Sequence, residues 1–314
     1  MAQIHPVADP LLAGDDHLPD TEKRLAASVD LDAMSTLQVL QLLTSQDRVA
    51  VEAVAAAAPQ LALLVDTAAE RLRRGGSVHY FGAGTSGRLA VLDAAELLPT
   101  FNLDRGVVVA HMAGGPEALA TAIENVEDSR EEGAHDAAAL GPDDVAIGIT
   151  ASGNTPYVGG ALAAASERGA YTALISCNPR ATLATGVDLD VVLATGPEVI
   201  TGSTRLKAGT AEKLALNGFS TTLMVALGRT WSNLMVSVVA TNAKLRRRTI
   251  RILMQASGLT EAASVELLAR TEGDLKVAIV AAVAPADPDP ARRALAAADG
   301  SVRDALRLLS AASA

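Results

Sequence analysis

The sequence has few aromatic residues and a single cysteine. Aromatic side chains make up 2% of the 314 residues, so the stacking surfaces that bind single-stranded nucleic acid are not expected. Cys177 is the only cysteine, which excludes an intrachain disulfide and therefore a small secreted fold held by disulfides. With so few aromatic rings, alanine, valine and leucine must fill the core.

The sequence also lacks an excess of positive charge and lacks long apolar runs. Its formal net charge is −10, which disfavours non-specific binding to nucleic acid and to anionic membranes. No uncharged apolar run approaches the roughly 18 residues of a membrane span. The N-terminal stretch has no basic segment followed by an apolar one, so no signal peptide is predicted. We therefore expect a cytoplasmic protein with neither nucleic acid nor a membrane as a partner.

Composition divides the chain into three predicted parts. Residues 1–66 combine a leader rich in proline, aspartate and glycine with an N-terminal helical arm. Residues 67–229 alternate short β-like runs with helical ones, and residues 230–314 show helical periodicity without a strand signal. A chain of this length accommodates one large or two small domains.

The middle part carries the pattern of an α/β protein. Strands are predicted over residues 77–81, 107–112, 145–150, 172–176 and 190–195. Helices are predicted over 35–74, with Ser35 or Thr36 as the cap, and over 86–97, 116–128, 156–168 and 205–228. Such alternation builds a parallel sheet covered on both faces. The predicted fold is a five-stranded parallel sheet sandwiched by helices, with the helical arm before it and a helical region after it.

A glycine-rich turn follows the first predicted strand. Residues 82–88 match G-x-G-x-x-G, a pattern of dinucleotide-binding turns, which also need an acid after the second strand. Residues 111–115 supply no acid there. A tight strand-to-helix turn would also need glycine. A monophosphate site fits better, because Gly84 lets backbone N–H groups approach an anion at a helix N-terminus, and Thr85 and Ser86 add hydroxyl donors.

Two more loops of small, hydroxyl-bearing residues follow later strands: residues 150–156 follow the third predicted strand, and residues 202–207 follow the last one. Ligands of open α/β sheets bind at the carboxyl ends of the strands, so the three loops are expected to line one phosphate pocket. Arg205 and Lys207 supply the positive charge that the composition lacks, and Glu198 lies beside the third loop. Taken singly, each loop is also explained by helix capping. The candidate binding residues are Gly84, Thr85, Ser86, Ser152, Asn154, Thr155, Glu198, Ser203, Thr204, Arg205 and Lys207.

These motifs together resemble the sugar isomerase (SIS) domain. More narrowly, they are similar to the N-acetylmuramic acid 6-phosphate etherase family, which is related to the glucokinase regulatory protein. The resemblance covers about residues 21–260, and the tail is similar to the small three-helix C-terminal domain of that family. It rests on G-A-G-T-S-G-R-L, A-S-G-N-T-P-Y, I-S-C-N-P, G-P-E-V-I-T-G-S-T-R-L-K-A-G-T and A-T-N-A-K-L.

The resemblance implies a carbon–oxygen lyase of cell-wall amino-sugar recycling. Its substrate would be N-acetylmuramic acid 6-phosphate, and its products N-acetylglucosamine 6-phosphate and D-lactate. The two glutamates that the family uses correspond to Glu96, as proton donor, and Glu127, as base. The reaction requires no metal or other cofactor, and histidine and cysteine are too sparse here for an obvious metal site. The sequence departs from the family pattern at Leu25, Ala95, Leu97 and Leu98.

A homodimer with composite sites is also expected. Glu96 lies ten residues after Ser86 on one predicted helix, or on the order of 15 Å along its axis, which is long for one hexose 6-phosphate. Either the helix breaks early or Glu96 serves the neighbouring subunit's site, and SIS domains commonly place their sites at dimer interfaces.

Two other functions compete with the lyase. One is a non-catalytic regulatory protein that senses sugar phosphates through its SIS domain, and the other is an aldose–ketose isomerase on the same fold. The presence of both Glu96 and Glu127 favours the lyase over the sensor. The long stretch from Gly196 to Thr210, which is typical of the etherases, argues against the isomerase.

Overall fold

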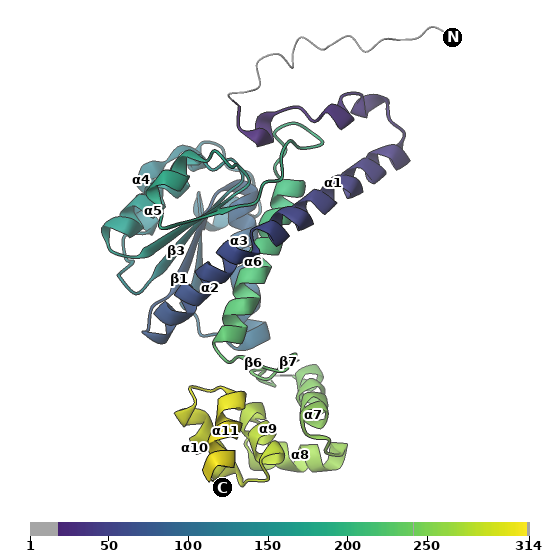
Figure 1. The fold of residues 1–314 in the computed structure, drawn as a ribbon, viewed down its shortest axis with the longest axis vertical. Coiled ribbons are helices and arrows are strands. Elements are labelled where there is room, and N and C mark those ends of the chain that lie inside the picture. The colour runs from purple at the N-terminus through teal and green to yellow at the C-terminus, as the bar shows by residue number, and fades with distance from the viewer. Residues whose placement is uncertain (1–17, 241, 313–314) are drawn as a thin grey trace. The chain divides into compact units, whose positions relative to one another are not determined.

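The computed structural model describes residues 18–240 and 242–312, in two compact units (Figure 1). The sheet unit contains Asp93 and the described residues before it, together with Val108–Phe219. The helical unit contains Ala94–Val107 and the described residues from Ser220 onward. Most of the predicted leader, residues 1–17, lies outside the described residues. The predicted division at residues 66/67 and 229/230 stays a prediction.

The sheet unit is built on five parallel strands, as predicted. They are β1 (Val78–Gly82), β2 (Val108–Met112), β3 (Val145–Thr150), β4 (Tyr171–Ser176) and β5 (Leu189–Val192). Their order in the sheet is β2-β1-β3-β4-β5, and every pairing is parallel. Every residue of β3 is buried, which explains its continuous apolar sequence because helices cover both faces of such a sheet.

Six α-helices begin in the sheet unit. They are α1 (Thr36–Ala56), α2 (Ala58–Arg73), α3 (Gly84–Phe101), α4 (Arg130–Asp136), α5 (Pro156–Glu167) and α6 (Lys207–Ala226). Short 3-10 helices lie at Asp20–Glu22, Ala26–Ser28, Leu31–Ala33, Gly115–Leu119, Val126–Asp128 and Thr182–Gly186. The helical region predicted over 35–74 is confirmed as two helices, and Ser35 caps α1 through a capping box with Gln38. Both α3 and α6 continue into the helical unit.

No single α-helix of the described residues is long and apolar enough to cross a membrane. One bent pair, α1 followed by α2 at 54°, satisfies the criteria of length and composition when both helices are taken together.

The helix predicted over residues 116–128 is wrong. The segment instead forms the two 3-10 helices at Gly115–Leu119 and Val126–Asp128. Asn125 between them has φ 65°, a left-handed conformation that interrupts a right-handed helix. The intervening residues are exposed, so no buried face stabilises a longer helix. The α-helix α4 begins only at Arg130.

The contact between α4 and α5 depends on two glycines. A Cβ atom on Gly133 of α4 would lie 1.9 Å from the carbonyl oxygen of Tyr157, and one on Gly160 of α5 would lie 2.0 Å from that of Arg130. The two backbones therefore touch directly. The buried Tyr157 hydroxyl donates to Asp136 Oδ2 at 2.6 Å across the same contact. Burial and this carboxylate raise the pKa of Tyr157.

The helical unit has its own core. Its helices are α7 (Ala243–Ser257), α8 (Glu261–Arg270), α9 (Leu275–Val283), α10 (Pro288–Ala297) and α11 (Val302–Ala312). A glycine turn at Gly273, which has φ 82°, separates α8 from α9. A strand pair that the sequence did not indicate, β6 (Thr230–Trp231) with β7 (Leu234–Met235), precedes α7. Trp231 packs against a buried cluster that includes Leu253, Ile279 and Val302.

Candidate functional site

The strand order places a topological switch point at the ends of β1 and β3. These strands are neighbours, with Gly82 beside Ile149 in the register. The chain goes from β1 outward to β2 on one side and returns to β3 on the other, so the connections leave the two strands in opposite directions. Open α/β sheets bind ligands at such a switch point. The first two predicted loops follow these two strands and therefore lie at the switch point.

The first loop turns directly from β1 into α3. Gly84, with φ 54°, begins the helix, so the unpaired N–H groups of the first turn lie at the end of β1. A Cβ atom on Gly87 would lie 2.6 Å from the carbonyl oxygen of Gly82. Glycine is thus required for the turn itself as well as for access to backbone N–H groups. Thr85 is half-buried and Ser86 is buried.

The second loop is held by hydroxyl groups. Thr150 Oγ1 shares hydrogen bonds with Thr155 Oγ1 at 2.7 Å and with Ser152 Oγ at 3.3 Å. Thr155 occupies the N-cap position of α5 without making a side-chain cap hydrogen bond, so capping does not explain its hydroxyl. Asn154 Oδ1 accepts from the backbone N–H and the hydroxyl of Thr182, at 2.9 and 2.7 Å. Thr150, the last residue of β3, was not among the binding residues predicted from the sequence.

The third loop lies beside the first. A Cβ atom on Gly209 of α6 would lie 3.3 Å from Thr85 Cγ2 and 3.1 Å from the carbonyl oxygen of Thr204. The Gly209 N–H also donates to that oxygen at 2.8 Å. The structure therefore brings the Thr85 and Thr204 segments together. Ser203 and Thr204 are half-buried, and Arg205 is exposed.

Lys207 and Glu198 have partners that the sequence did not predict. The fully buried carboxylate of Glu198 accepts from the backbone N–H groups of Lys207 and Ala208, at 3.3 and 2.9 Å, and so caps α6. The buried Lys207 ammonium donates to Gln46 Oε1 of α1 at 2.7 Å. Burial raises the pKa of Glu198 and lowers that of Lys207. The charge of Lys207 thus lies between α1 and the start of α6.

The N-terminal Thr21-Glu22 pair packs on the third loop. The Gly202 N–H donates to the carbonyl oxygen of Thr21 at 3.1 Å, and a Cβ atom on Gly202 would lie 3.1 Å from the Glu22 carboxylate. Thr21 is fully buried. Thr21 and Glu22 belong to the same short segment as Leu25, one of the positions at which the sequence departs from the family pattern. This segment therefore contacts a loop of the candidate site.

Glu212 is the residue at this site that sequence reasoning missed most clearly. Ser86 Oγ donates to Glu212 Oε1 at 2.9 Å, and the carboxyl group is fully buried. Burial raises its pKa to about 8. The sequence did contain a signal: Glu212 lies four residues after Ala208 and four before Leu216, on the buried face of α6. An acid on an apolar helix face calls for an explanation.

The two candidate catalytic glutamates are both exposed. Glu96 lies on α3, within the part of that helix that belongs to the helical unit. Because α3 continues unbroken from Gly84 to Phe101, the early helix break considered above does not occur. Glu127 lies in the 3-10 helix Val126–Asp128 of the sheet unit. Within the described residues, no group of three or more His, Cys, Asp or Glu is arranged to hold a metal ion.

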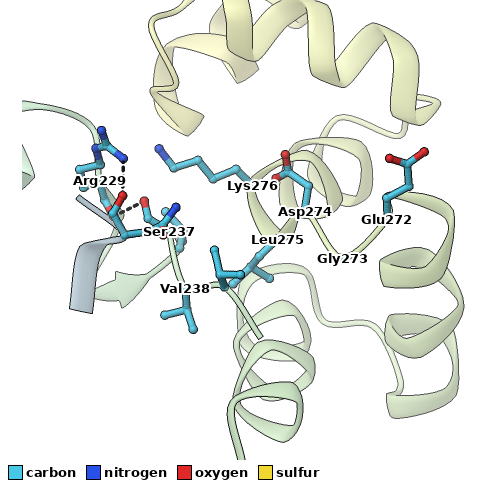
Figure 2. Close-up of a pocket in the computed structure, with 11 residues that line it drawn as sticks. Arg229, Ser237, Val238, Glu272, Gly273, Asp274, Leu275 and Lys276 are labelled. Atoms are coloured by element: carbon cyan, nitrogen blue, oxygen red, sulfur yellow. Dashed lines mark hydrogen bonds between the residues drawn. The ribbon is translucent and has the colours of Figure 1, made fainter. Parts of the chain in front are cut away.

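A cavity of about 350 Å³ lies in the helical unit, and no candidate site residue is among those that line it. Figure 2 shows Lys276 extending toward Arg229 at its edge. The Lys276 ammonium donates to the carbonyl oxygens of Gly228 and Gly300, at 2.9 and 2.7 Å. Burial and the nearby guanidinium lower its pKa to about 8. Lys276 therefore ties together two turns of this unit.

Comparisons with known proteins show to which family the chain is similar. A family model described as the glucokinase regulatory protein N-terminal SIS domain matches residues 60–166. The N-acetylmuramic acid 6-phosphate etherase of Thermobifida fusca is 54% identical over 260 residues, which is 83% of this chain and 86% of that protein. The protein of that name from Rubrobacter xylanophilus is 50% identical over 288 residues, 91% of this chain and 95% of its own.

A solved structure supports the fold alone. A phosphoheptose isomerase from Francisella tularensis superimposes with a TM-score of 0.50 and 21% identity, over 61% of this chain and all of that one.

Proposed function

The chain belongs to the N-acetylmuramic acid 6-phosphate etherase family, and we propose that it cleaves the D-lactyl ether of N-acetylmuramic acid 6-phosphate. With one water consumed, the products are N-acetylglucosamine 6-phosphate and D-lactate, and the enzyme is a carbon–oxygen lyase of cytoplasmic amino-sugar recycling. The observation that carries the proposal is 50% identity over 91% of the chain to a protein of that name. Incubating the pure protein with this substrate and assaying D-lactate tests it.

The three loops at the strand ends are proposed to hold the 6-phosphate. Support comes from the switch point between β1 and β3, from the helix N-terminus that begins at Gly84, and from the Thr155 hydroxyl, which is not used as a cap. Helix N-termini and hydroxyl donors suit a phosphate because they offer hydrogen bonds and a positive dipole end. In a chain of net charge −10, such local donors must outweigh an unfavourable overall field.

The proposed chemistry is an elimination followed by addition of water. When the sugar ring opens, the C1 aldehyde makes the C2 hydrogen acidic. Glu127 removes this proton, and Glu96 protonates the lactyl oxygen as its bond to C3 breaks. Water then adds to the unsaturated aldehyde at C3. One carboxyl group must start ionised and the other protonated, a division of roles that local environments can produce.

Nothing observed here favours a purely regulatory role. The similarity to the glucokinase regulatory protein is to one domain, over residues 60–166, whereas the similarity to the etherases extends over most of the chain. A regulatory protein would bind the sugar phosphate without releasing D-lactate, so the assay above also separates these two functions.

Replacing Ser86 with alanine should weaken binding of the phosphorylated sugar. The change removes one charge-assisted hydrogen bond, which is worth about 1.5–3 kcal/mol, or roughly 10- to 150-fold in affinity. Calorimetric titration with N-acetylglucosamine 6-phosphate measures this loss, and titration with unphosphorylated N-acetylglucosamine is the control. Equal affinity of the wild-type protein for the two sugars would show that the phosphate pocket is misassigned.

The active protein is proposed to be a homodimer in which Glu96 serves the partner's site. The unbroken α3 supports this, because Glu96 lies on the order of 15 Å along the helix from Ser86. If so, Glu96→Gln and Glu127→Gln proteins, each inactive alone, should restore activity to each other after mixing and subunit exchange. The expected recovery is about a quarter of wild-type turnover, since half of the dimers are mixed and one of their two sites is intact.

Failure to recover activity would place both glutamates in the same subunit's site. Measuring the molar mass of the mixture by light scattering, with one variant carrying a purification tag, confirms that mixed dimers have formed. A fully active monomer in solution would contradict the composite site directly.

A further inference from the structure

Glu212 is hydrogen-bonded to Ser86, a residue of the proposed phosphate pocket, and the role assigned to it below rests on that pocket. We propose that Glu212 is a positioning residue that must carry a proton before Ser86 can donate its hydroxyl hydrogen to the sugar phosphate, so that binding of the phosphate takes up a proton. Glu212 itself does not contact the ligand in this account. It acts through Ser86, which separates it from the pocket.

The number of hydrogens on Ser86 makes this coupling necessary. A serine hydroxyl has one hydrogen to donate and two lone pairs to accept. In the structure Ser86 donates that hydrogen to Glu212 Oε1, at 2.9 Å. An ionised carboxylate only accepts, so it would keep the hydrogen, and Ser86 could present only lone pairs to an equally electron-rich phosphate oxygen. A protonated Glu212 can instead donate its own hydrogen to Ser86 Oγ at the same separation. The Ser86 hydrogen is then free to be donated to the phosphate.

The surroundings of Glu212 favour the protonated form. The side chain is fully buried, and Oε2 has no hydrogen-bond partner within the described part of the chain. An ionised carboxylate in such a place is costly because it has lost its water and only one oxygen accepts a hydrogen bond. Accordingly, burial raises its pKa to about 8, against a smaller opposing effect of the Ser86 hydrogen bond.

The neighbouring titratable groups do not supply a compensating positive charge. Cys177, after β4, is buried, and its pKa is raised by burial and by the charges of Glu212 and Glu198. Glu198 lies at the start of α6, and the Lys207 ammonium that faces it donates to Gln46. A phosphate dianion bound beyond Ser86 would add a negative charge to this group of acids. It would therefore raise the pKa of Glu212 further and draw a proton onto it.

The affinity for a sugar phosphate should therefore fall at high pH. The second pKa of a phosphate ester lies near 6, so N-acetylglucosamine 6-phosphate stays dianionic from about pH 7.5 upward. One proton taken up by a group of pKa about 8 predicts a loss of roughly 10-fold or more in affinity between about pH 7.5 and 9.5. In Glu212→Gln the amide donates to Ser86 at every pH, so its affinity should not change over this range.

Calorimetric titration of the full-length protein with N-acetylglucosamine 6-phosphate tests the coupling. At pH 8.5, in buffers of different ionisation enthalpy, the wild-type protein should take up roughly three quarters of a proton per site, and Glu212→Gln none. Glu52→Gln, which removes an equal charge from an exposed position on α1, is the matched control and should behave as the wild type. The wild-type measurement stands even if Glu212→Gln does not fold.

The outcomes separate this inference from the proposed function. If the wild-type protein binds the phosphorylated sugar with the same affinity at every pH and takes up no proton, Glu212 plays no such part, although the pocket is correctly assigned. If the wild-type protein does not bind the phosphorylated sugar even at pH 7.5, the proposed function itself fails. Proton uptake that persists in Glu212→Gln would assign the proton to another group and overturn the inference.

Discussion

Replacing either candidate catalytic glutamate with glutamine should reduce turnover by roughly 10²–10⁴-fold, the usual contribution of a positioned acid or base. Glutamine keeps the shape and the hydrogen bonding of the side chain but can neither take nor deliver the proton. Because Glu96 and Glu127 are both exposed, the free energy of unfolding should change little. D-Lactate release measures turnover, and binding of N-acetylglucosamine 6-phosphate should be retained.

The two variants should differ in one assay. In deuterated water, the Glu96→Gln enzyme still removes the C2 proton but cannot protonate the lactyl oxygen, so recovered substrate should carry deuterium at C2. The Glu127→Gln enzyme should exchange this position slowly or not at all. Glu124→Gln, in the same exposed segment as Glu127, is the matched control and should keep wild-type turnover. The reverse pattern would exchange the roles of the two glutamates, and full activity in both variants would remove them from the mechanism.

The second large effect is expected on stability, from Gly160→Ala. The added Cβ atom would lie 2.0 Å from the carbonyl oxygen of Arg130, and neither backbone can move without separating α5 from α4. Overpacking of a core costs about 3 kcal/mol at the upper end of its usual range. A loss of 1 kcal/mol lowers the melting temperature of a unit of this size by roughly 2–4 °C. The melting temperature should fall by about 6–12 °C, as measured by circular dichroism.

Gly159→Ala is the matched control for that experiment. The two glycines are adjacent on α5, and alanine gains the same helix propensity at both positions. The Cβ atom at Gly159 would meet only the ends of the Leu183 and Arg130 side chains, at 2.8 and 2.9 Å, which can rotate away. Its cost should therefore be much smaller. Similar losses in the two variants would show that the close backbone contact does not govern the stability of this pair of helices.

The central strands β1, β3 and β4 were predictable from sequence because nearly all of their residues are buried. Continuous apolar runs such as Val145–Thr150 leave few alternatives. The segment 116–128 was not predictable in the same way, since its composition permits a helix. A helix does not form because Asn125 has a left-handed conformation and because the segment has no surface to pack on. Both features depend on tertiary structure. The strand pair β6–β7 has only two residues in each strand, which is too short for a periodicity to emerge.

The loops of the candidate site were predictable from sequence, but the side chains that form hydrogen bonds with the loop residues were not. Small hydroxyl-bearing residues after apolar strands are a local signal, and they led to Ser86 and Thr155. The carboxyl group beneath Ser86 comes from Glu212, which is 126 residues away in the chain. Gln46, which accepts from Lys207, is 161 residues away. Local sequence patterns do not show which distant residues meet, so the hydrogen bonds that fix the state of these groups become visible only in the fold.

The scarcity of rings gives each unit its own optical signature. The one tryptophan, Trp231, packs on the core of the helical unit. The three tyrosines, Tyr80, Tyr157 and Tyr171, all lie in the sheet unit. Indole fluorescence therefore reports on the environment of the helical unit, and tyrosine absorbance reports on the sheet unit. The unmodified protein thus carries two separate probes, with which the melting of each unit can be followed in one sample without introducing a label.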